Sequence, residues 1–460
     1  MTVHIQTLNS RRRGAAAAAL LLLVAAGCMS TDRILSVEDP DIINPADVQS
    51  PAGANAVRIG ALARFNTATS GDESLFLLGG MLGDEWINGD SFIDRQQIDQ
   101  RVIVTSNSFL TTASRAINRA RLSALQATQL MKQYNASAPG WQPAEMYFVE
   151  GYTENLMGED YCNGLVFSSI VDGKEQYGSQ ITDQAAFAQA LAHVDSGLAL
   201  VTGSTTDDVR VRNALAVLRG RILLNIGPSR YAEAATSVAA VPTSFKYQEL
   251  HALTATTNSI WSLNNSNRRY SVAANEGTNG LNYSTANDPR IPVCQGGDSA
   301  CKANGVSQAS RDDLGKPFTV QLIWPTAASS VTIVSGIEAR LIEAEAAQAA
   351  GNPGAAIAAL NAARATVPGL APLADPGTDP ARVDLIFRER AFWMFSTGHR
   401  LGDMRRLIRQ YGRAADTVFP VGPWHKGGNY GTDVNVPIPQ AELNNPNLPA
   451  SGQTCLDRNA

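Results

Sequence analysis

Apolar residues recur every three to four positions along much of the chain, which is the spacing of one face of an α-helix. The stretch 108–134 keeps this period through Leu122, Leu125 and Leu130, and the first such stretch begins near Asp47. The pattern predicts a mostly α fold. The predicted helices span residues 47–65, 75–86, 108–134, 143–158, 183–201, 207–226, 229–240, 335–350, 353–366, 380–396 and 401–411.

The helical pattern stops in the middle of the chain. Residues 254–325 are rich in Asn, Ser, Gly, Tyr and Trp and show little periodicity. An irregular stretch of this length inside a compact domain is uncommon and usually functional, so we expect a ligand-binding region with short strands. Residues 335–412 contain the C-terminal helices, and residues 413–460 form an irregular tail. We predict one domain over residues 47–460.

Two predicted helix pairs share the features of one repeated unit. The first spans residues 211–227 and 229–240, and the second spans residues 335–351 and 353–366. Small residues such as Gly220 suit positions where the two helices of a unit pack closely. The pattern favours tetratricopeptide-like helical hairpins, with two unrelated Ala-rich hairpins as the alternative. The matching positions of the second pair are Ala344, Ala356, Leu360, Ala363 and Pro368.

Composition narrows the class of protein and of partner. Apolar residues make up 44% of the chain and charged residues 17%, which is typical of a globular protein. There are 37 basic and 42 acidic residues, for a formal net charge of −5. With no basic surplus we expect no nucleic-acid partner, and a neutral ligand suits this surface better than an anionic polymer.

The N-terminus has the features of an export signal. Three arginines at positions 11–13 precede a short apolar run, whereas a membrane-spanning helix needs about 20 apolar residues. Small residues then lead to Cys28, as in the bacterial lipoprotein box, although Ala25 stands where that box most often has Leu. We predict a lipoprotein signal peptide (1–27), lipidation of Cys28 and a tether (28–46). An ordinary secretory signal, with this cysteine incidental, is the alternative.

Four further cysteines suggest disulfide bonds in an exported chain, with three possible pairings. Cys294 and Cys301 enclose a polar, Gly-rich stretch that would close a small loop, so we predict a disulfide between them. Cys162 and Cys455 are the other two. A zinc site is the alternative, but the sequence has no C-x-x-C and no histidine near these positions.

The sequence lacks the motifs of common enzymes and cofactor sites. There is no H-E-x-x-H, no G-x-S-x-G and no Walker loop, so we predict no enzyme and no cofactor. A glycosidase needs two nearby carboxylates, for which Asp84, Glu85, Asp90 and Asp94 are the candidates. For these four carboxylates we favour a structural role instead, at a helix end or in ion pairs with Arg95. The mature chain has four histidines, none paired at metal spacing, so we predict no metal site: His193, His251, His399 and His425.

Three motifs in the C-terminal third are similar to those of a known family. Residues 389–390 and 398–406 match an E-R…G-x-R-x-x-D-[LM]-R-R helix pair. Residues 436–448 match a P-I-P…E…N-P-N motif, and residues 338–346 match an L-[IL]-x-A-E-A helix. The chain therefore resembles the RagB/SusD family of nutrient-binding outer-membrane lipoproteins.

The resemblance implies a SusD-like fold with tetratricopeptide-like hairpins and a lipid anchor at the cell surface. It also implies that the protein holds an oligosaccharide or peptide and passes it to a SusC-like TonB-dependent transporter. Trp393, Thr397, Leu401 and Gly402 depart from the family pattern, so ligand specificity is not transferred. A tetratricopeptide-type protein-binding adaptor and a surface glycan hydrolase are the alternatives.

Charged residues concentrate in the same C-terminal helices. Such a cluster most often forms ion pairs between packed helices and only occasionally clamps a ligand, so we predict the structural role. The cluster contains Arg388, Glu389, Arg390, Arg400, Asp403, Arg405 and Arg406.

Sugars present apolar C–H faces ringed by hydroxyls, so their binding proteins need exposed aromatic rings beside amides and hydroxyls. Tyr270 and Tyr283 lie among polar residues in the irregular region. Replacing both with Ala should then leave the melting temperature nearly unchanged. Trp261 and Trp324 have apolar neighbours, so their sequence fits a role as core anchors at least as well as a role in ligand binding. The predicted ligand-binding residues are Tyr270, Tyr283, Trp261, Trp324, Asn282 and Trp86.

Overall fold

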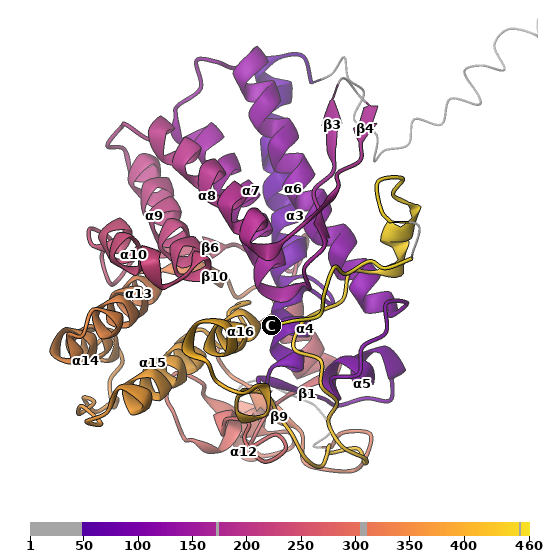
Figure 1. Cartoon of the computed structure of the whole chain (residues 1–460), viewed down its shortest axis with the longest axis vertical. Helices are drawn as coiled ribbons and strands as arrows, with labels where there is room; N and C mark the ends of the chain where they lie inside the picture. The colour runs from indigo at the N-terminus through magenta and orange to yellow at the C-terminus, as the bar shows by residue number, and fades with distance from the viewer. Residues whose placement is uncertain (1–47, 172–173, 304–310, 450–451) are drawn as a thin grey trace, which may run out of the picture. The chain divides into compact units, whose positions relative to one another are not determined.

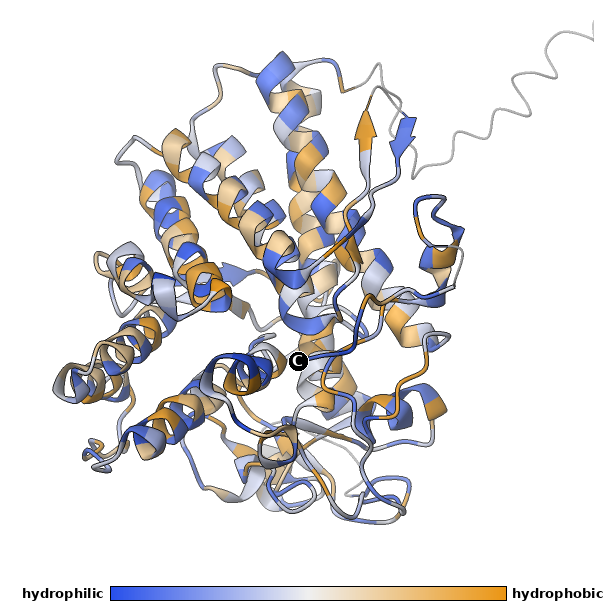
Figure 2. Ribbon diagram, viewed as in Figure 1, coloured by the Kyte–Doolittle hydropathy of each residue, from blue (hydrophilic) through white to orange (hydrophobic). Residues whose placement is uncertain are grey.

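The computed structural model describes residues 48–171, 174–303, 311–449 and 452–460. Within the chain, Ser50–Ala460 forms one compact unit. This unit is mostly α-helical, as the hydrophobic pattern predicts. Figure 2 shows hydrophobic and hydrophilic residues on each long helix, as expected where one face of a helix is buried and the other is exposed.

The long helices pack side by side in an order that follows the chain (Figure 1). Helix α6 contacts α7, α7 contacts α8, and the series continues through α9, α10, α13 and α14, while α3 packs on α6. Most predicted helices lie within a few residues of the observed ones. The helices of this stack are α3 (Pro51–Ser70), α6 (Ser108–Tyr134), α7 (Trp141–Asp160), α8 (Asp183–Leu200), α9 (Thr206–Ile226), α10 (Tyr231–Val238), α13 (Gly336–Ala349) and α14 (Pro353–Arg364).

The two predicted hairpins are neighbours in this stack, because α13 packs against α10. In the sequence, the irregular region separates these two hairpins. A Cβ atom built at Gly220 would lie 2.8 Å from Val238 Cγ1 and 3.1 Å from Ile342 Cδ1. These distances leave no room for a larger residue. Glycine is therefore needed where α9 passes close to α10 and α13, as the tetratricopeptide-like pattern predicts.

Polar residues directly before the helices explain where several of them begin. The Ser50 hydroxyl accepts a hydrogen bond from the amide of Gly53, and Pro51 occupies the first helical position of α3. At the start of α9, Thr205 and Asp208 form a capping box. Each cap satisfies amide groups that have no partner inside the helix.

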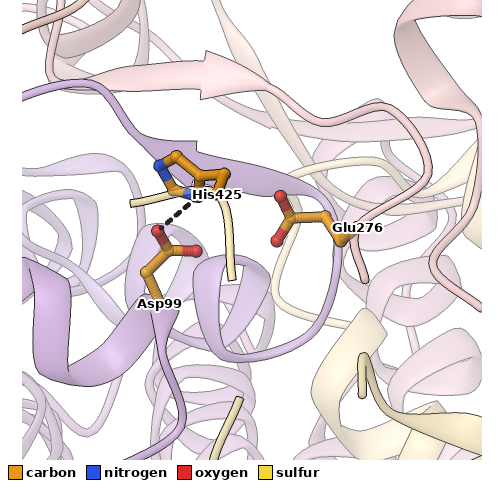
Figure 3. A group of neighbouring side chains, drawn as sticks. All are labelled: Asp99, Glu276 and His425. Atoms are coloured by element: carbon orange, nitrogen blue, oxygen red, sulfur yellow. Dashed lines mark ion pairs between the residues drawn. The ribbon is translucent and has the colours of Figure 1, made fainter. Parts of the chain in front are cut away.

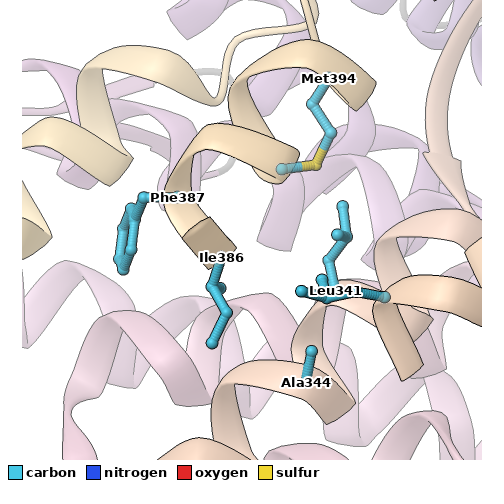
Figure 4. Close-up of a cluster of buried hydrophobic side chains, with 6 residues drawn as sticks. Leu341, Ala344, Ile386, Phe387 and Met394 are labelled. Carbon is cyan, nitrogen blue, oxygen red and sulfur yellow. The ribbon is translucent and has the colours of Figure 1, made fainter. Parts of the chain in front are cut away.

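Two further helices, α15 (Asp379–Trp393) and α16 (Arg400–Tyr411), complete the C-terminal part. Helix α15 packs against α13 and α14. The apolar cluster between these helices appears in Figure 4. Burial of its side chains contributes about 1.5–3 kcal/mol for each large residue. Its buried members are Leu341, Ala344, Leu360, Ile386, Phe387 and Met394.

Buried arginines of the C-terminal helices form ion pairs with carboxylates on other elements. Arg406 Nη1 lies 2.5 Å from Glu345 Oε1 on α13, and Arg390 Nε lies 2.7 Å from Asp403 Oδ2 on α16. The predicted ion-pairing role is confirmed for Arg390, Arg400, Arg405 and Arg406, whereas Arg388 donates a hydrogen bond to Asn282. Removing one partner of a buried pair typically costs about 3–5 kcal/mol, because it leaves an uncompensated charge. Comparable pairs are Arg400–Asp84, Arg405–Asp183 and Arg290–Glu389.

Short elements form the irregular part, which lies below the helices in the view of Figure 1. Strand β1 (Trp86–Asn88) pairs antiparallel with β7 (Tyr270–Val272), which places residues far apart in sequence side by side. Within this part β8 (Val293–Gln295) also pairs antiparallel with β9 (Thr319–Gln321). Strands β6 (Lys246–Glu249) and β10 (Val331–Ser335) flank the irregular region in sequence and pair with each other beside α9. The irregular region thus contains short strands, as predicted.

The remaining elements are small. Two strand pairs lie near the C-terminal tail: β2 (Leu165–Val166) with β5 (Gln180–Ile181), and β3 (Ser169–Val171) with β4 (Lys174–Gln176). The short helices are α4 (Leu75–Leu82), α5 (Ile93–Asp99), α11 (Ser259–Trp261), α12 (Ser299–Ala303) and α17 (Ala415–Val418).

Two disulfide bonds connect the four described cysteines. One joins Cys294 to Cys301, the pair that the sequence analysis proposes. The other joins Cys162, which directly follows the α7 helix end, to Cys455 in the C-terminal tail across 293 residues. Without the bond, a segment of this length has many conformations in the unfolded chain. The cross-link therefore strongly reduces the conformational entropy of the unfolded state.

The predicted signal peptide, Cys28 and the whole tether lie outside the described residues. Among the residues that are described, no helix combines the length and the apolar character that crossing a bilayer requires.

Candidate functional site

The structure places the two preferred ligand-binding tyrosines in the core. Tyr270 has 0% of its surface exposed and Tyr283 has 1%. Their hydroxyls donate hydrogen bonds to buried carboxylates, Glu73 for Tyr270 and Asp84 for Tyr283. The prediction that these rings are offered to a ligand is therefore wrong. The polar partners that a tyrosine hydroxyl needs come from other segments of the fold, so polar neighbours in sequence do not indicate exposure.

The predicted tryptophans differ from one another. Trp86 is 0% exposed and its indole donates to Ser396 Oγ at 3.0 Å, so its predicted place beside a ligand is also wrong. Trp324 is 5% exposed and fills the core, which is the anchor role considered for it above. Trp261 is partly exposed and stays a candidate, together with Asn282, which accepts a hydrogen bond from Arg388 at 3.0 Å.

Among the residues that the structure describes, Phe92 has the most exposed aromatic ring, with 53% of its surface exposed. It directly precedes α5, at the end of a turn built by polar side chains. Asn88 Oδ1 accepts from the amide of Asp90, and Asp90 Oδ1 accepts from the amide of Phe92, both at 3.0 Å. These hydrogen bonds are the Asx-type turns that Asn and Asp favour, and they hold the ring at the surface.

Charged groups from other segments lie at this ring or contact Asp90, which is two residues before it. The Arg269 guanidinium lies 5.0 Å from the centroid of the Phe92 ring and 2.8 Å from Asp90. Lys426 of the tail donates to the backbone carbonyl of Asp90 and to the Asp313 carboxylate, both at 2.6 Å. We call these five residues the Phe92 surface. Most of its charges are paired with one another, so the face is polar without a strong net charge of one sign.

The Phe92 surface has the chemistry of a sugar platform. An exposed ring offers an apolar face to C–H groups, and the partly exposed Arg269 guanidinium and Asp313 carboxylate of this surface can bind hydroxyls. Phe92 is not among the ligand-binding residues predicted from the sequence, because it lies before the region 254–325. The turn sequence from Asn88 to Asp90, followed directly by an aromatic residue, is the signal that would have found it.

The predicted acidic cluster is structural. Both Asp84 oxygens are held by Arg400, at 2.6 and 2.9 Å. Asp90 is 2.5 Å from Arg95, and Asp94 accepts at 2.9 Å from the amide of Ser108, the first residue of α6. The preference for ion pairs and a helix end over a glycosidase pair is confirmed for these three carboxylates.

A separate groove lies on the helical side, between α3, α7, α9 and β6. Its volume is about 680 Å³. Trp141 lies in this groove with the guanidiniums of Arg58 and Arg210 at 5.2 and 5.8 Å from its ring centroid. Leu250, at the edge, is 77% exposed. An exposed apolar residue beside an Arg-flanked Trp is typical of a protein contact.

Comparison with known proteins finds structural but not sequence relatives. No family model matches the sequence, and no curated protein matches it significantly. A surface glycan-binding protein A from Bacteroides uniformis matches with a TM-score of 0.64 and 13% identity, over 86% of this chain and 98% of that one.

Two more solved structures agree with this match. A SusD superfamily protein from Parabacteroides distasonis gives a TM-score of 0.63 at 13% identity, over 86% of this chain and 98% of the other. One from Bacteroides vulgatus gives 0.57 at 15% identity, over 88% and 99%. The RagB/SusD resemblance is confirmed at the level of the fold, which is SusD-like.

Proposed function

We propose that this protein is an outer-membrane lipoprotein at the cell surface that binds an oligosaccharide and delivers it to a SusC-like TonB-dependent transporter. The observation that carries the proposal is the SusD-like fold, which it shares with a surface glycan-binding protein along nearly the whole of that protein. The Ala25–Cys28 sequence, which is similar to a lipoprotein box, supports the anchored location. A peptide is the alternative ligand.

We place oligosaccharide binding at the Phe92 surface, with Trp261 and Asn282 as further candidates. Sugar–aromatic stacking needs an open ring, and the Phe92 ring is 53% exposed beside Arg269 and Asp90. The irregular segments that build this surface can change without disturbing the helical core, as is common for binding regions.

Binding can be tested by retention on immobilised polysaccharides, followed by calorimetry with oligosaccharides from a retained polymer. Phe92→Ala should weaken binding about fivefold to tenfold, because an aromatic contact contributes about 1 kcal/mol beyond the area that it buries. Tyr177→Ala is the matched control, since this ring is 47% exposed and lies directly after strand β4, outside the Phe92 surface. It should bind like the wild type.

The outcomes separate the site from the function. Equal affinity of the Phe92→Ala variant and the wild type would move the site elsewhere. Failure of the wild type to bind any glycan or peptide would refute nutrient binding. We further propose that the ligand is not cleaved, so native and boiled protein should leave a bound glycan equally intact.

Protein binding through the helical side is a second candidate function, as expected of a tetratricopeptide-type adaptor. The groove around Trp141, with Leu250 exposed beside it, favours this function. Affinity purification from cross-linked outer membranes tests both functions together. Recovery of a TonB-dependent transporter would support the delivery role, and a Trp141→Ala variant that lost a different protein partner would support the adaptor.

A further inference from the structure

Three potential metal ligands from distant parts of the chain lie close together (Figure 3). Asp99 ends helix α5, Glu276 follows strand β7, and His425 lies in the C-terminal tail next to Lys426. One ligand atom from each lies within 4.8 Å of the other two. Asp99 is 1% exposed and Glu276 is 6% exposed, whereas 15% of the His425 side chain is exposed.

Hydrogen bonds from outside the cluster orient all three side chains. Asp99 Oδ2 accepts from the amide of Asn88 and from the indole of Trp424, both at 3.1 Å. Glu276 Oε2 accepts from the Tyr430 hydroxyl at 3.0 Å. Partners of this kind are the usual support of metal ligands, because they fix the direction of each donor atom.

The histidine is oriented as a metal ligand would be. Its Nε2 lies 3.2 Å from the carbonyl oxygen of Asn88, and a carbonyl can only accept a hydrogen bond. The proton of a neutral imidazole therefore belongs on Nε2, which leaves the lone pair on Nδ1. That Nδ1 lies 3.5 Å from Asp99 Oδ2. Two ligands bound about 2.0–2.2 Å from one tetrahedral ion lie at nearly this separation, about 3.3–3.6 Å.

Some atoms of the cluster lack the partners that burial normally requires. Within the described part of the chain, Asp99 Oδ1 and His425 Nδ1 are buried without a hydrogen-bond partner. In Figure 3 the Asp99 and Glu276 carboxylates face each other. A bound cation would satisfy these atoms and offset the repulsion between the carboxylates.

We propose that Asp99, Glu276 and His425 bind a divalent transition-metal ion, for which Zn²⁺ is the best-fitting example. One imidazole nitrogen and two carboxylate oxygens form a set that Zn²⁺ accepts, with water in the fourth position. Ca²⁺ fits less well, because it prefers six to eight oxygen ligands. The three ligand atoms lie within 4.8 Å of one another, whereas ligands of a tetrahedral ion lie about 3.3–3.6 Å apart, so small side-chain movements would close the site around the ion.

The ion would join three segments, two of which also contribute to the Phe92 surface. Asp99 belongs to the helix that follows Phe92, and His425 precedes Lys426, which contacts Asp90. Metal binding would therefore hold the tail and the irregular region against α5. This site is independent of the oligosaccharide proposal, since it concerns a buried cluster and not the exposed ring.

The test is calorimetric titration of the chelator-stripped protein with ZnCl₂, with metal analysis after dialysis. The wild type should bind one Zn²⁺ per chain, and Zn²⁺ should raise its melting temperature. His425→Gln and Glu276→Gln should bind at least 100-fold more weakly and show no such rise. His251→Gln is the matched control, because this histidine lies outside the cluster, and it should behave like the wild type.

Other outcomes would overturn the proposal. In the first, the wild type binds no Zn²⁺. In the second, the wild type and His425→Gln bind Zn²⁺ equally. In the third, these two proteins bind Ca²⁺ with equal strength. Circular dichroism reports whether each variant is folded. If a ligand variant is unfolded, Tyr430→Phe replaces it, because this change removes only the hydroxyl that orients Glu276. It should weaken Zn²⁺ binding about tenfold, and unchanged affinity would refute the site.

Discussion

Replacing Tyr270 with Ala should destabilise the protein strongly. The ring is 0% exposed, lies edge-on to Trp86 with 6.3 Å between the ring centroids, and donates its hydroxyl to Glu73. Removing a buried aromatic ring typically costs about 3–5 kcal/mol, from lost burial and from the cavity that remains. A buried carboxyl that loses its hydrogen bond adds about 1–3 kcal/mol. Tyr270→Phe removes only the hydroxyl, so it should cost only this smaller amount.

Denaturant unfolding followed by circular dichroism measures both variants. The midpoint should fall in the order wild type, Tyr270→Phe, Tyr270→Ala, with an unchanged dependence on denaturant concentration. Tyr177→Ala is the control at an exposed ring and should stay within about 0.5 kcal/mol of the wild type. A Tyr270→Ala variant within about 1 kcal/mol of the wild type would show that this ring is not part of the core.

Three further predictions concern other parts of the chain. Cys28→Ala should abolish palmitate labelling and release the protein from the membrane, and equal labelling of the two proteins would exclude this cysteine as the acceptor. Loss of the Cys294–Cys301 bond, by replacing both residues with Ser, should lower the free energy of unfolding by about 2–3 kcal/mol; unchanged stability would contradict this. Burial raises the pKa of Glu85 from 4.5 to about 8, so the folded protein holds this proton more tightly than the unfolded chain. The resulting stability is present at low pH and is lost as the pH rises from about 5 to 8. Glu85→Gln should therefore gain stability relative to the wild type over this range, whereas parallel pH curves would refute the assignment.

Features that depend on nearby residues could be predicted from the sequence. The period of Leu122, Leu125 and Leu130 reflects burial of one helix face, and the predicted bounds of α6 match the observed ones. Gly220 could be assigned to a close helix contact because the spacing of small residues repeats along the chain. The C-terminal arginines could be assigned to ion pairs, because a charge on an otherwise apolar helix needs an opposite charge nearby.

The candidate site was predicted only in part, because some of its features do not depend on nearby residues alone. The irregular region was found, because its composition and lack of period are visible along the chain. The exposed ring of the candidate site, Phe92, was not predicted, because exposure depends on what the rest of the fold covers. Phe92 and Tyr270 are both aromatic residues beside polar ones, yet one is 53% exposed and the other is buried.

Tertiary structure decided which distant groups meet. Tyr270 is buried because Glu73, 197 residues away in sequence, accepts its hydroxyl, and Cys162 finds Cys455 across 293 residues. The cluster of Asp99, Glu276 and His425 shows no motif spacing, since its members come from a helix end, a loop and the tail. Local patterns determine helices because their hydrogen bonds join residues four positions apart. Buried polar partners and metal ligands have no such fixed separation, so only the packing of the folded chain brings them together.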